Sequence, residues 1–301
     1  MLWRYLLLMF GVFTGATAVI MIRQCSVHPS LLASYRQGVA AVVLLPLFLR
    51  DWRRRRATFG WPQVGMTVLP GLFLGGHFIT WIIGARMTPP ANSSLVVNML
   101  PVVMPFLAYF LIREPLRKGE LAGTAMAMVG VAVLAGQDFH LDRTSFLGDL
   151  ICFGSMLLFA AYIALARRNR EHIVSLWLYV VPIYAVGALA CLAAALPQVS
   201  PLAVGGGRDW LMILGLGIIP TVMGHSILNY SMKHLRSQVV SIANLSQFIY
   251  AGIMGYFVER AVPGWAFYPA SLLLIAGSVL ALKSQPPAER EELAKDQAQA
   301  T

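Results

Sequence analysis

Two histidines lie in apolar stretches of the chain, and each has a potential partner four residues later. His77 is followed by Trp81, and His225 is followed by Asn229. Residues four apart share one face of a helix, and a polar side chain inside a membrane helix usually faces a cavity or a partner helix. Each pair could therefore line a path for a polar solute, with an aromatic wall from Trp81 and an amide from Asn229. Alternatively, each histidine only donates to a neighbouring helix and fixes packing.

Amide side chains mark two further stretches. Asn98 precedes Pro101, which lacks an N–H group and leaves a carbonyl free one turn earlier. Asn244, Gln247 and Tyr250 occupy the matching part of the second half of the chain. Free carbonyls and amides could bind a polar solute, and Gln247 offers both donors and acceptors, as a zwitterion requires. Interhelical hydrogen bonding is the alternative for both stretches.

Arg36 is the only charged residue deep inside an apolar run. It could capture a carboxylate or phosphate of a substrate, or its side chain could snorkel to the nearby end of its helix. No Asp or Glu lies deep within an apolar run, so only His77 and His225 could take up a proton there near neutral pH. We therefore expect either histidine-dependent proton coupling or uncoupled movement of a solute.

The composition points to lipid as the solvent for much of the chain. Of 301 residues, 58% are hydrophobic and 12% are charged, about half the charged fraction of a soluble domain. The net charge of +10 comes from short clusters between apolar runs, which argues against nucleic-acid binding. Cys25, Cys152 and Cys191 have no metal or disulfide spacing. We expect no cofactor and no metal.

A membrane helix needs about 20 mainly apolar residues, and ten runs meet this pattern. They are residues 3–22, 31–49, 64–84, 92–112, 119–136, 146–166, 174–196, 210–232, 237–258 and 263–282. With the N-terminus inside, the inner segments carry 17 Lys and Arg and the outer segments carry 5. This positive-inside bias predicts a multi-pass protein of the inner membrane with both termini cytoplasmic.

The two ends of the chain carry further signals. Residues 1–18 resemble a cleavable signal peptide, because an apolar run leads to Ala16-Thr17-Ala18. The run continues to residue 22, which favours a retained span. Residues 284–301 are polar and are predicted to form a cytoplasmic tail.

The second half of the chain repeats the first. His77 aligns with His225 at an offset of 225 − 77 = 148, and Gly130 aligns with Gly277 at 277 − 130 = 147. Five spans per copy is an odd number, so the second copy is inverted across the bilayer. We expect repeats at 1–137 and 145–283, an architecture typical of alternating-access transporters.

Several short motifs connect the chain to a known family. They are PANSSL at 90–95, NMLPV at 98–102, REPL at 113–116, ELAG at 120–123 and GV at 130–131. This pattern resembles the EamA-type repeat of the drug/metabolite transporter superfamily. The second copy departs from it where Ser246 and Gln247 replace the proline, and it keeps Val258-Glu259-Arg260 and Gly277. The resemblance implies a ten-helix exporter with a central cavity.

The predicted fold is therefore an all-α integral membrane protein of ten helices in two inverted five-helix repeats. The predicted function is secondary transport, as an exporter of amino acids, nucleobases or drug-like solutes, working as a monomer or homodimer. A membrane channel and an intramembrane enzyme remain as alternatives. Glu114, beside Arg113 at a helix end, is expected to form an exposed ion pair. The predicted binding residues are Arg36, His77, Trp81, Asn98, His225, Asn229, Gln247 and Tyr250.

Overall fold

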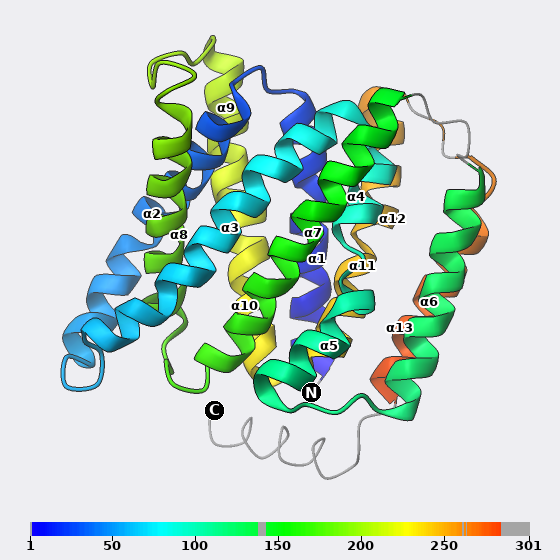
Figure 1. The fold of residues 1–301 in the computed structure, drawn as a ribbon, viewed down its shortest axis with the longest axis horizontal. Helices are drawn as coiled ribbons and strands as arrows, with labels where there is room; N and C mark the ends of the chain where they lie inside the picture. The colour runs from blue at the N-terminus through cyan, green and yellow to red at the C-terminus, as the bar shows by residue number, and fades with distance from the viewer. Residues whose placement is uncertain (1, 138–142, 261, 263, 284–301) are drawn as a thin grey trace.

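The computed structural model describes residues 2–137, 143–260, 262 and 264–283, and every regular element in these ranges is a helix (Figure 1). The predicted tail at 284–301 lies outside them. The elements are α1 (Leu2–Arg23), α2 (Pro29–Arg54), α3 (Trp61–Met87), α4 (Pro90–Val97), α5 (Leu100–Ile112), α6 (Lys118–Gln137), α7 (Arg143–Asn169), α8 (Leu176–Ala195), α9 (Gly207–Leu216), the π-helical η1 (Gly217–His225), α10 (Ser226–His234), α11 (Ser237–Leu245), α12 (Gln247–Glu259) and α13 (Phe267–Lys283).

Eight segments of the described chain are long and apolar enough to cross a membrane. A ninth, Phe267–Ala281, is apolar but shorter. The predicted span at 119–136 forms α6, a helix of 20 residues that is not among these eight. The chain is thus a multi-pass membrane protein with eight or nine membrane-capable helical segments, and the count of ten crossings stays a prediction.

Two predicted spans are each broken into two helices. The sequence predicts one helix over 92–112, but α4 ends at Val97 and α5 begins at Leu100. Pro101 explains this break, because its ring clashes with the carbonyl four residues earlier and it has no N–H to donate. The span at 237–258 breaks at Ser246, whose ψ of −8° departs from helical geometry and separates α11 from α12.

A third irregularity interrupts the predicted span at 210–232. Its middle section, η1, is π-helical and contains Pro220. In a π-helix each backbone N–H donates to the carbonyl five residues earlier. The Thr221 side-chain hydroxyl also donates to the carbonyl five residues earlier, that of Leu216, at 2.7 Å. Irregular backbone of this kind frequently occurs at functional sites.

Glycines set how closely the helices approach. A Cβ added at Gly84 of α3 would lie 2.8 Å from the carbonyl oxygen of Gly148 in α7. At the crossing of α6 and α13, which stand side by side at the right edge of Figure 1, a Cβ on Gly277 would lie 2.5 Å from the carbonyl oxygen of Gly123. Both distances are below ordinary van der Waals contact, so these backbones touch only because the side chains are absent.

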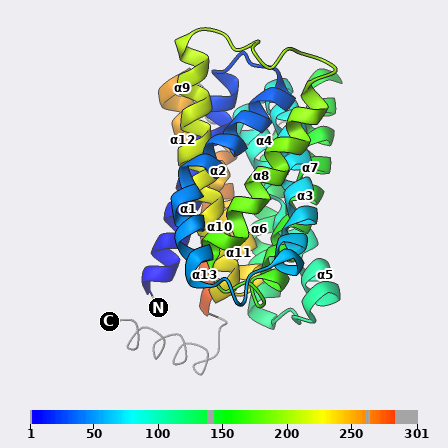
Figure 2. The ribbon, with the colours of Figure 1, turned by 90° about the vertical axis from the view of Figure 1, so that its left-hand side faces the viewer.

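The helix ends alternate between the two ends of the bundle. The start of α1 and the connections α2–α3, α5–α6, α7–α8 and α10–α11 all lie at the lower end in Figures 1 and 2, and α8–α9 lies at the upper end. The arginine-rich segments at 50–56 and 167–170 therefore share the lower end. This is the arrangement that the charge pattern predicts.

Candidate substrate site

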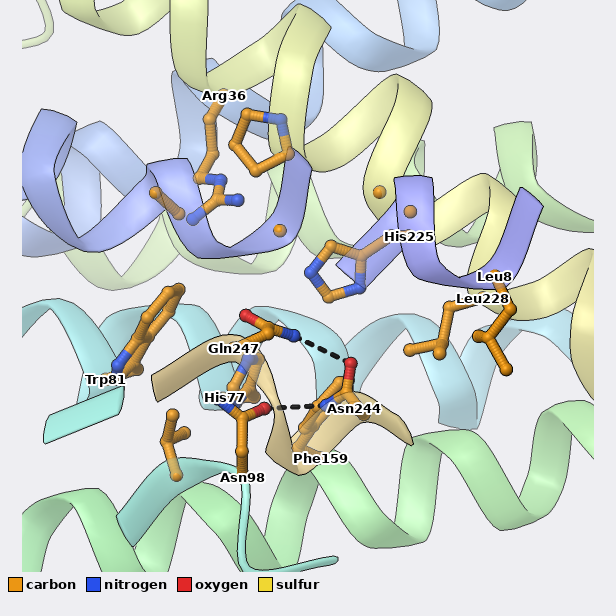
Figure 3. A pocket seen from close by; sticks show the side chains of 16 residues that line it. Leu8, Arg36, His77, Trp81, Asn98, Phe159, His225, Leu228, Asn244 and Gln247 are labelled. Atoms are coloured by element: carbon orange, nitrogen blue, oxygen red, sulfur yellow. Dashed lines mark hydrogen bonds between the residues drawn. The ribbon is translucent and has the colours of Figure 1, made fainter. Parts of the chain in front are cut away.

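A small pocket lies at the centre of the bundle, between helices from both halves of the chain (Figure 3). We call it the central pocket. Its space open to a water-sized sphere is about 20 Å³, which is room for roughly one water. Six of the eight predicted binding residues line it, and they are Arg36, His77, Trp81, Asn98, His225 and Gln247.

The two histidines lie close together, as the repeat predicts. Their ring centroids are 6.3 Å apart. The Nδ1 atom of His77 lies 2.9 Å from the Ser155 hydroxyl and 3.2 Å from the Ser155 carbonyl oxygen. That hydroxyl is also placed to donate to the His77 carbonyl at 2.8 Å. Because the Ser155 carbonyl can only accept, this geometry fits the tautomer that carries the proton on Nδ1. His77 thus joins α3 to α7 while its ring lines the pocket.

Aromatic rings form one wall of the central pocket. The His77 ring is stacked on Trp81, with centroids 5.8 Å apart and planes inclined by 12°, and on Phe159 at 4.6 Å and 16°. The Phe78 and His225 rings are nearly perpendicular, with centroids 5.0 Å apart. Two polar atoms here, Nε1 of Trp81 and Nδ1 of His225, are buried without a hydrogen-bond partner.

Arg36 is fully buried at 0% exposure and does not snorkel. Its Nε and Nη2 atoms donate to the Thr221 hydroxyl of η1 at 3.1 and 3.0 Å. Its guanidinium carbon lies 3.8 Å from the centroid of the Phe78 ring, a cation–π contact. The remaining nitrogen, Nη1, has no partner. In the described part of the chain no Asp or Glu lines the pocket beside it.

A chain of amides connects the two helix breaks. Gln247 donates to the Asn244 oxygen at 2.7 Å, Asn244 donates to the Asn98 oxygen at 2.6 Å, and Asn98 donates to the Ser94 carbonyl at 2.7 Å. In Figure 3 the oxygen of the Gln247 amide points away from Asn244. The amides therefore link α12 and α11 of the second half to the α4–α5 break of the first half.

Two predicted binding residues lie outside the central pocket. Asn229 turns to Tyr162, to whose hydroxyl it donates, and to the His225 carbonyl at 2.7 Å. Tyr250 packs edge-on against Phe13, with centroids 5.4 Å apart. Neither residue is among those that line the pocket.

The sequence left three contributors without a role. Ser155 orients His77, and Thr221 orients Arg36. Both are hydroxyl residues inside apolar spans, and that position was the sequence signal that could have identified them. Phe159, the third, stacks on His77 but looks like any other apolar residue of its span. Only the packing of α7 against α3 identifies it.

Ionic contacts join the two halves at the lower end of the bundle. Glu114 does not form the expected exposed pair with Arg113. Its carboxylate accepts from the Ser237 backbone N–H at 3.1 Å and lies 3.6 Å from Arg167 and 3.8 Å from Arg236. The nearby Glu120 is fully buried and is paired with Arg236.

Hydrogen bonds join the halves at the upper end. The Asp209 carboxylate accepts from the Ser26 N–H at 2.9 Å and from its hydroxyl at 2.6 Å. Thr88 donates to Asp149 at 2.8 Å. The central pocket is therefore bounded along the bundle axis by contacts between the halves on both sides.

A model of the EamA-like transporter family matches residues 2–136 and again residues 146–283. The chain belongs to this family. The predicted kinship with the drug/metabolite transporter superfamily is confirmed, and the family and its named relatives are transporters.

Individual relatives of this EamA-like chain are also named as transporters. The aromatic amino acid exporter YddG of Ancylobacter novellus is 26% identical over 73% of this chain and 76% of that protein. The uncharacterized transporter YyaM of Bacillus subtilis is 28% identical over 54% of this chain, and the alignment spans 55% of YyaM. One solved crystal structure matches 94% of this chain and 98% of that one with a TM-score of 0.73 at 22% identity, which shows a shared fold.

Proposed function

We propose that this EamA-like chain is a secondary transporter that exports small metabolites across the inner membrane by alternating access. The observation that carries the proposal is the central pocket, where buried polar groups from both halves converge. Polar groups inside a membrane protein are costly and mark substrate paths. The family and its named relatives support the transporter class.

The crossing of α6 and α13 supports two inverted repeats. A Cβ on Gly277 would meet Gly123, and a Cβ on Gly130 would meet Ala270 at its carbonyl oxygen, 2.9 Å away. The repeat offset of 147 sends 123 to 270 and 130 to 277. Exchanging the two halves therefore turns the Gly123–Gly277 contact into the Gly130–Ala270 contact. This is expected if a two-fold axis in the membrane plane relates residues 1–137 to 145–283.

The helix breaks support a midplane binding site. Discontinuous helices at corresponding positions of two repeats are typical of substrate sites in secondary transporters. Here Asn98 lies in the α4–α5 break, and Asn244 lies two residues before the α11–α12 break at Ser246, at an offset of 244 − 98 = 146. The substrate would contact Arg36, Trp81 and Gln247, with Asn229 and Tyr250 supporting the wall from behind.

The substrate would be an amino acid, nucleobase or drug-like solute with a planar part. The relative in Ancylobacter novellus is named as an exporter of aromatic amino acids, and the stacked rings of Trp81, His77 and Phe159 would suit a planar solute. A channel would instead need a continuous water path, and a pocket with space for about one water favours a carrier.

Counterflow in proteoliposomes tests this proposal. Vesicles loaded with a mixture of amino acids, nucleobases, organic acids and cationic drugs should take up a labelled member of the mixture transiently above equilibrium, with saturation. We expect Gln247→Leu to lower uptake about tenfold, because it removes a pocket amide and a partner of Asn244. The matched control is Gln198→Leu, since Gln198 is exposed. Non-saturating flux without counterflow would indicate a channel.

A further inference from the structure

We infer that the central pocket selects a solute with a single carboxylate and a planar ring over a zwitterion or a cation. This inference rests on the proposed transport function and narrows its substrates to acidic solutes with a ring, so zwitterionic amino acids and uncharged nucleobases would bind less well. Its starting point is the charge balance of the pocket. Among its lining residues, all of which the structure describes, Arg36 is the only Lys or Arg and there is no Asp or Glu.

The charge on Arg36 has no counter-ion in the pocket. The ion pairs of the described residues leave Arg36 out, and its two bonded nitrogens donate to a neutral hydroxyl, that of Thr221. A buried charge is normally paired or coordinated because burying it alone is costly. The pocket therefore carries one positive charge that a bound monoanion would neutralise.

Three side-chain atoms of the lining are buried without a partner, and two of them are donors that suit a carboxylate; the third is Nδ1 of His225. Nη1 of Arg36 and Nε1 of Trp81 are donors, both are buried, and both belong to residues that line the pocket. A carboxylate offers two acceptor oxygens and no donor, and its hydrogen bonds to a guanidinium are among the strongest in proteins. In Figure 3 Trp81 lies below Arg36, with its six-membered ring toward Arg36 and its nitrogen at the other end of the ring.

An ammonium group would find no equivalent partner. It needs a carboxylate or several acceptor oxygens. The side-chain oxygens of the lining belong to Asn98, Asn244 and Gln247, and the first two already accept hydrogen bonds. It would also be repelled by Arg36, since like charges in a low-dielectric site interact strongly. A phosphate dianion would need a second cation, which the lining does not contain.

The planar part of the solute follows from the aromatic wall. Trp81, His77 and Phe159 present stacked rings, and Leu8 and Leu228 add apolar surface. An apolar ring would pack against these groups and leave the carboxylate directed toward Arg36.

Three compounds with one ring system test the charge selection directly. 3-(Indol-3-yl)propionate has the carboxylate alone, tryptophan has carboxylate and ammonium, and tryptamine has the ammonium alone. Calorimetric titration of the purified full-length chain should give at least about tenfold tighter binding of the propionate than of tryptophan, with tryptamine weakest. Equal binding, tighter binding of either amine, or no binding of any of the three would overturn the inference.

Variants separate charge recognition from a structural role of Arg36. Arg36→Gln should weaken binding of the propionate about 10- to 100-fold and remove the preference among the three compounds. Arg36→Lys should keep part of the preference. The matched control is Arg53→Gln, which removes an exposed charge from the same helix and should change neither. A structural loss alone would weaken all three compounds equally.

A second variant keeps the test valid if Arg36→Gln fails to fold. Trp81→Phe keeps a ring and removes one unpartnered donor, so it should weaken the propionate about three- to tenfold without lowering the melting temperature of the empty protein. Unchanged affinity would contradict the assignment. Counterflow of other solutes by a protein that shows no charge preference would refute this inference and leave the transport function standing.

Discussion

Replacing Gly277 by alanine tests the packing of α6 against α13. The new Cβ would lie 2.5 Å from the Gly123 carbonyl oxygen and 3.2 Å from the Ala127 nitrogen. Ordinary van der Waals contact begins near 3.4 Å, so the two helices must separate by roughly 3.4 − 2.5 = 0.9 Å. Overpacking of this kind costs about 1–3 kcal/mol.

Part of this cost is offset because alanine is a better helix former than glycine, by about 0.5–1 kcal/mol. We therefore expect a net destabilisation of about 0–2.5 kcal/mol, centred near 1 kcal/mol, or a fall in melting temperature of up to about 7 °C. The measurement is thermal unfolding in detergent, followed by tryptophan fluorescence.

Two other glycines provide a graded control. Gly130→Ala would place its Cβ 2.9 Å from the Ala270 carbonyl oxygen, so a smaller loss is expected. At Gly154 in α7 nothing lies within 4 Å of an added Cβ, and Gly154→Ala should be neutral or stabilising. If Gly277→Ala were as stable as Gly154→Ala, the close α6–α13 crossing would be wrong, and with it the main support for the two-fold relation of the halves.

Two further predictions concern the ends of the bundle. Arg236→Gln would leave the fully buried Glu120 without its cation. It should lower the free energy of unfolding by about 1–3 kcal/mol, since removing one partner of a buried ion pair is destabilising. The matched control Arg168→Gln removes an exposed charge and should lower the melting temperature by less than about 2 °C. At the other end, burial raises the pKa of the Cys25 thiol to about 11. Because the thiolate is the reactive form, maleimide labelling of Cys25, read by peptide mass, should stay slow from pH 7 to 9 and accelerate toward pH 11; fast labelling at pH 7.5 would contradict this.

The positions of the spans could be predicted from apolarity, but their internal breaks could not. The predicted span at 3–22 becomes α1 (Leu2–Arg23), because a long apolar run has no other stable form in lipid. Apolarity gives the depth of a residue and says nothing about its backbone hydrogen bonds. The break at Ser246 has no proline to announce it, so only the tertiary structure reveals it.

Spacing along a helix placed most of the pocket residues but could not separate adjacent faces. His225 lines the pocket, and Leu228 rather than Asn229 lines it with His225. The residues three and four positions after His225 lie on either side of the helix face that His225 occupies. The sequence alone therefore cannot show which of the two lines the pocket. The choice depends on η1, whose wider turns shift the register before α10 begins.

On the proposed mechanism, the small central pocket and the contacts around it would represent one conformation of a transport cycle. A space of about 20 Å³ cannot admit a solute with a ring and a carboxylate, so binding requires the walls to move apart. On the proposed mechanism, the parts best placed to move are those that already lack regular backbone bonding, namely η1 and the two helix breaks. Gln247, Asn244 and Asn98 connect these breaks across the halves, so a solute that competes for their amides would loosen the link between the halves at the moment it binds.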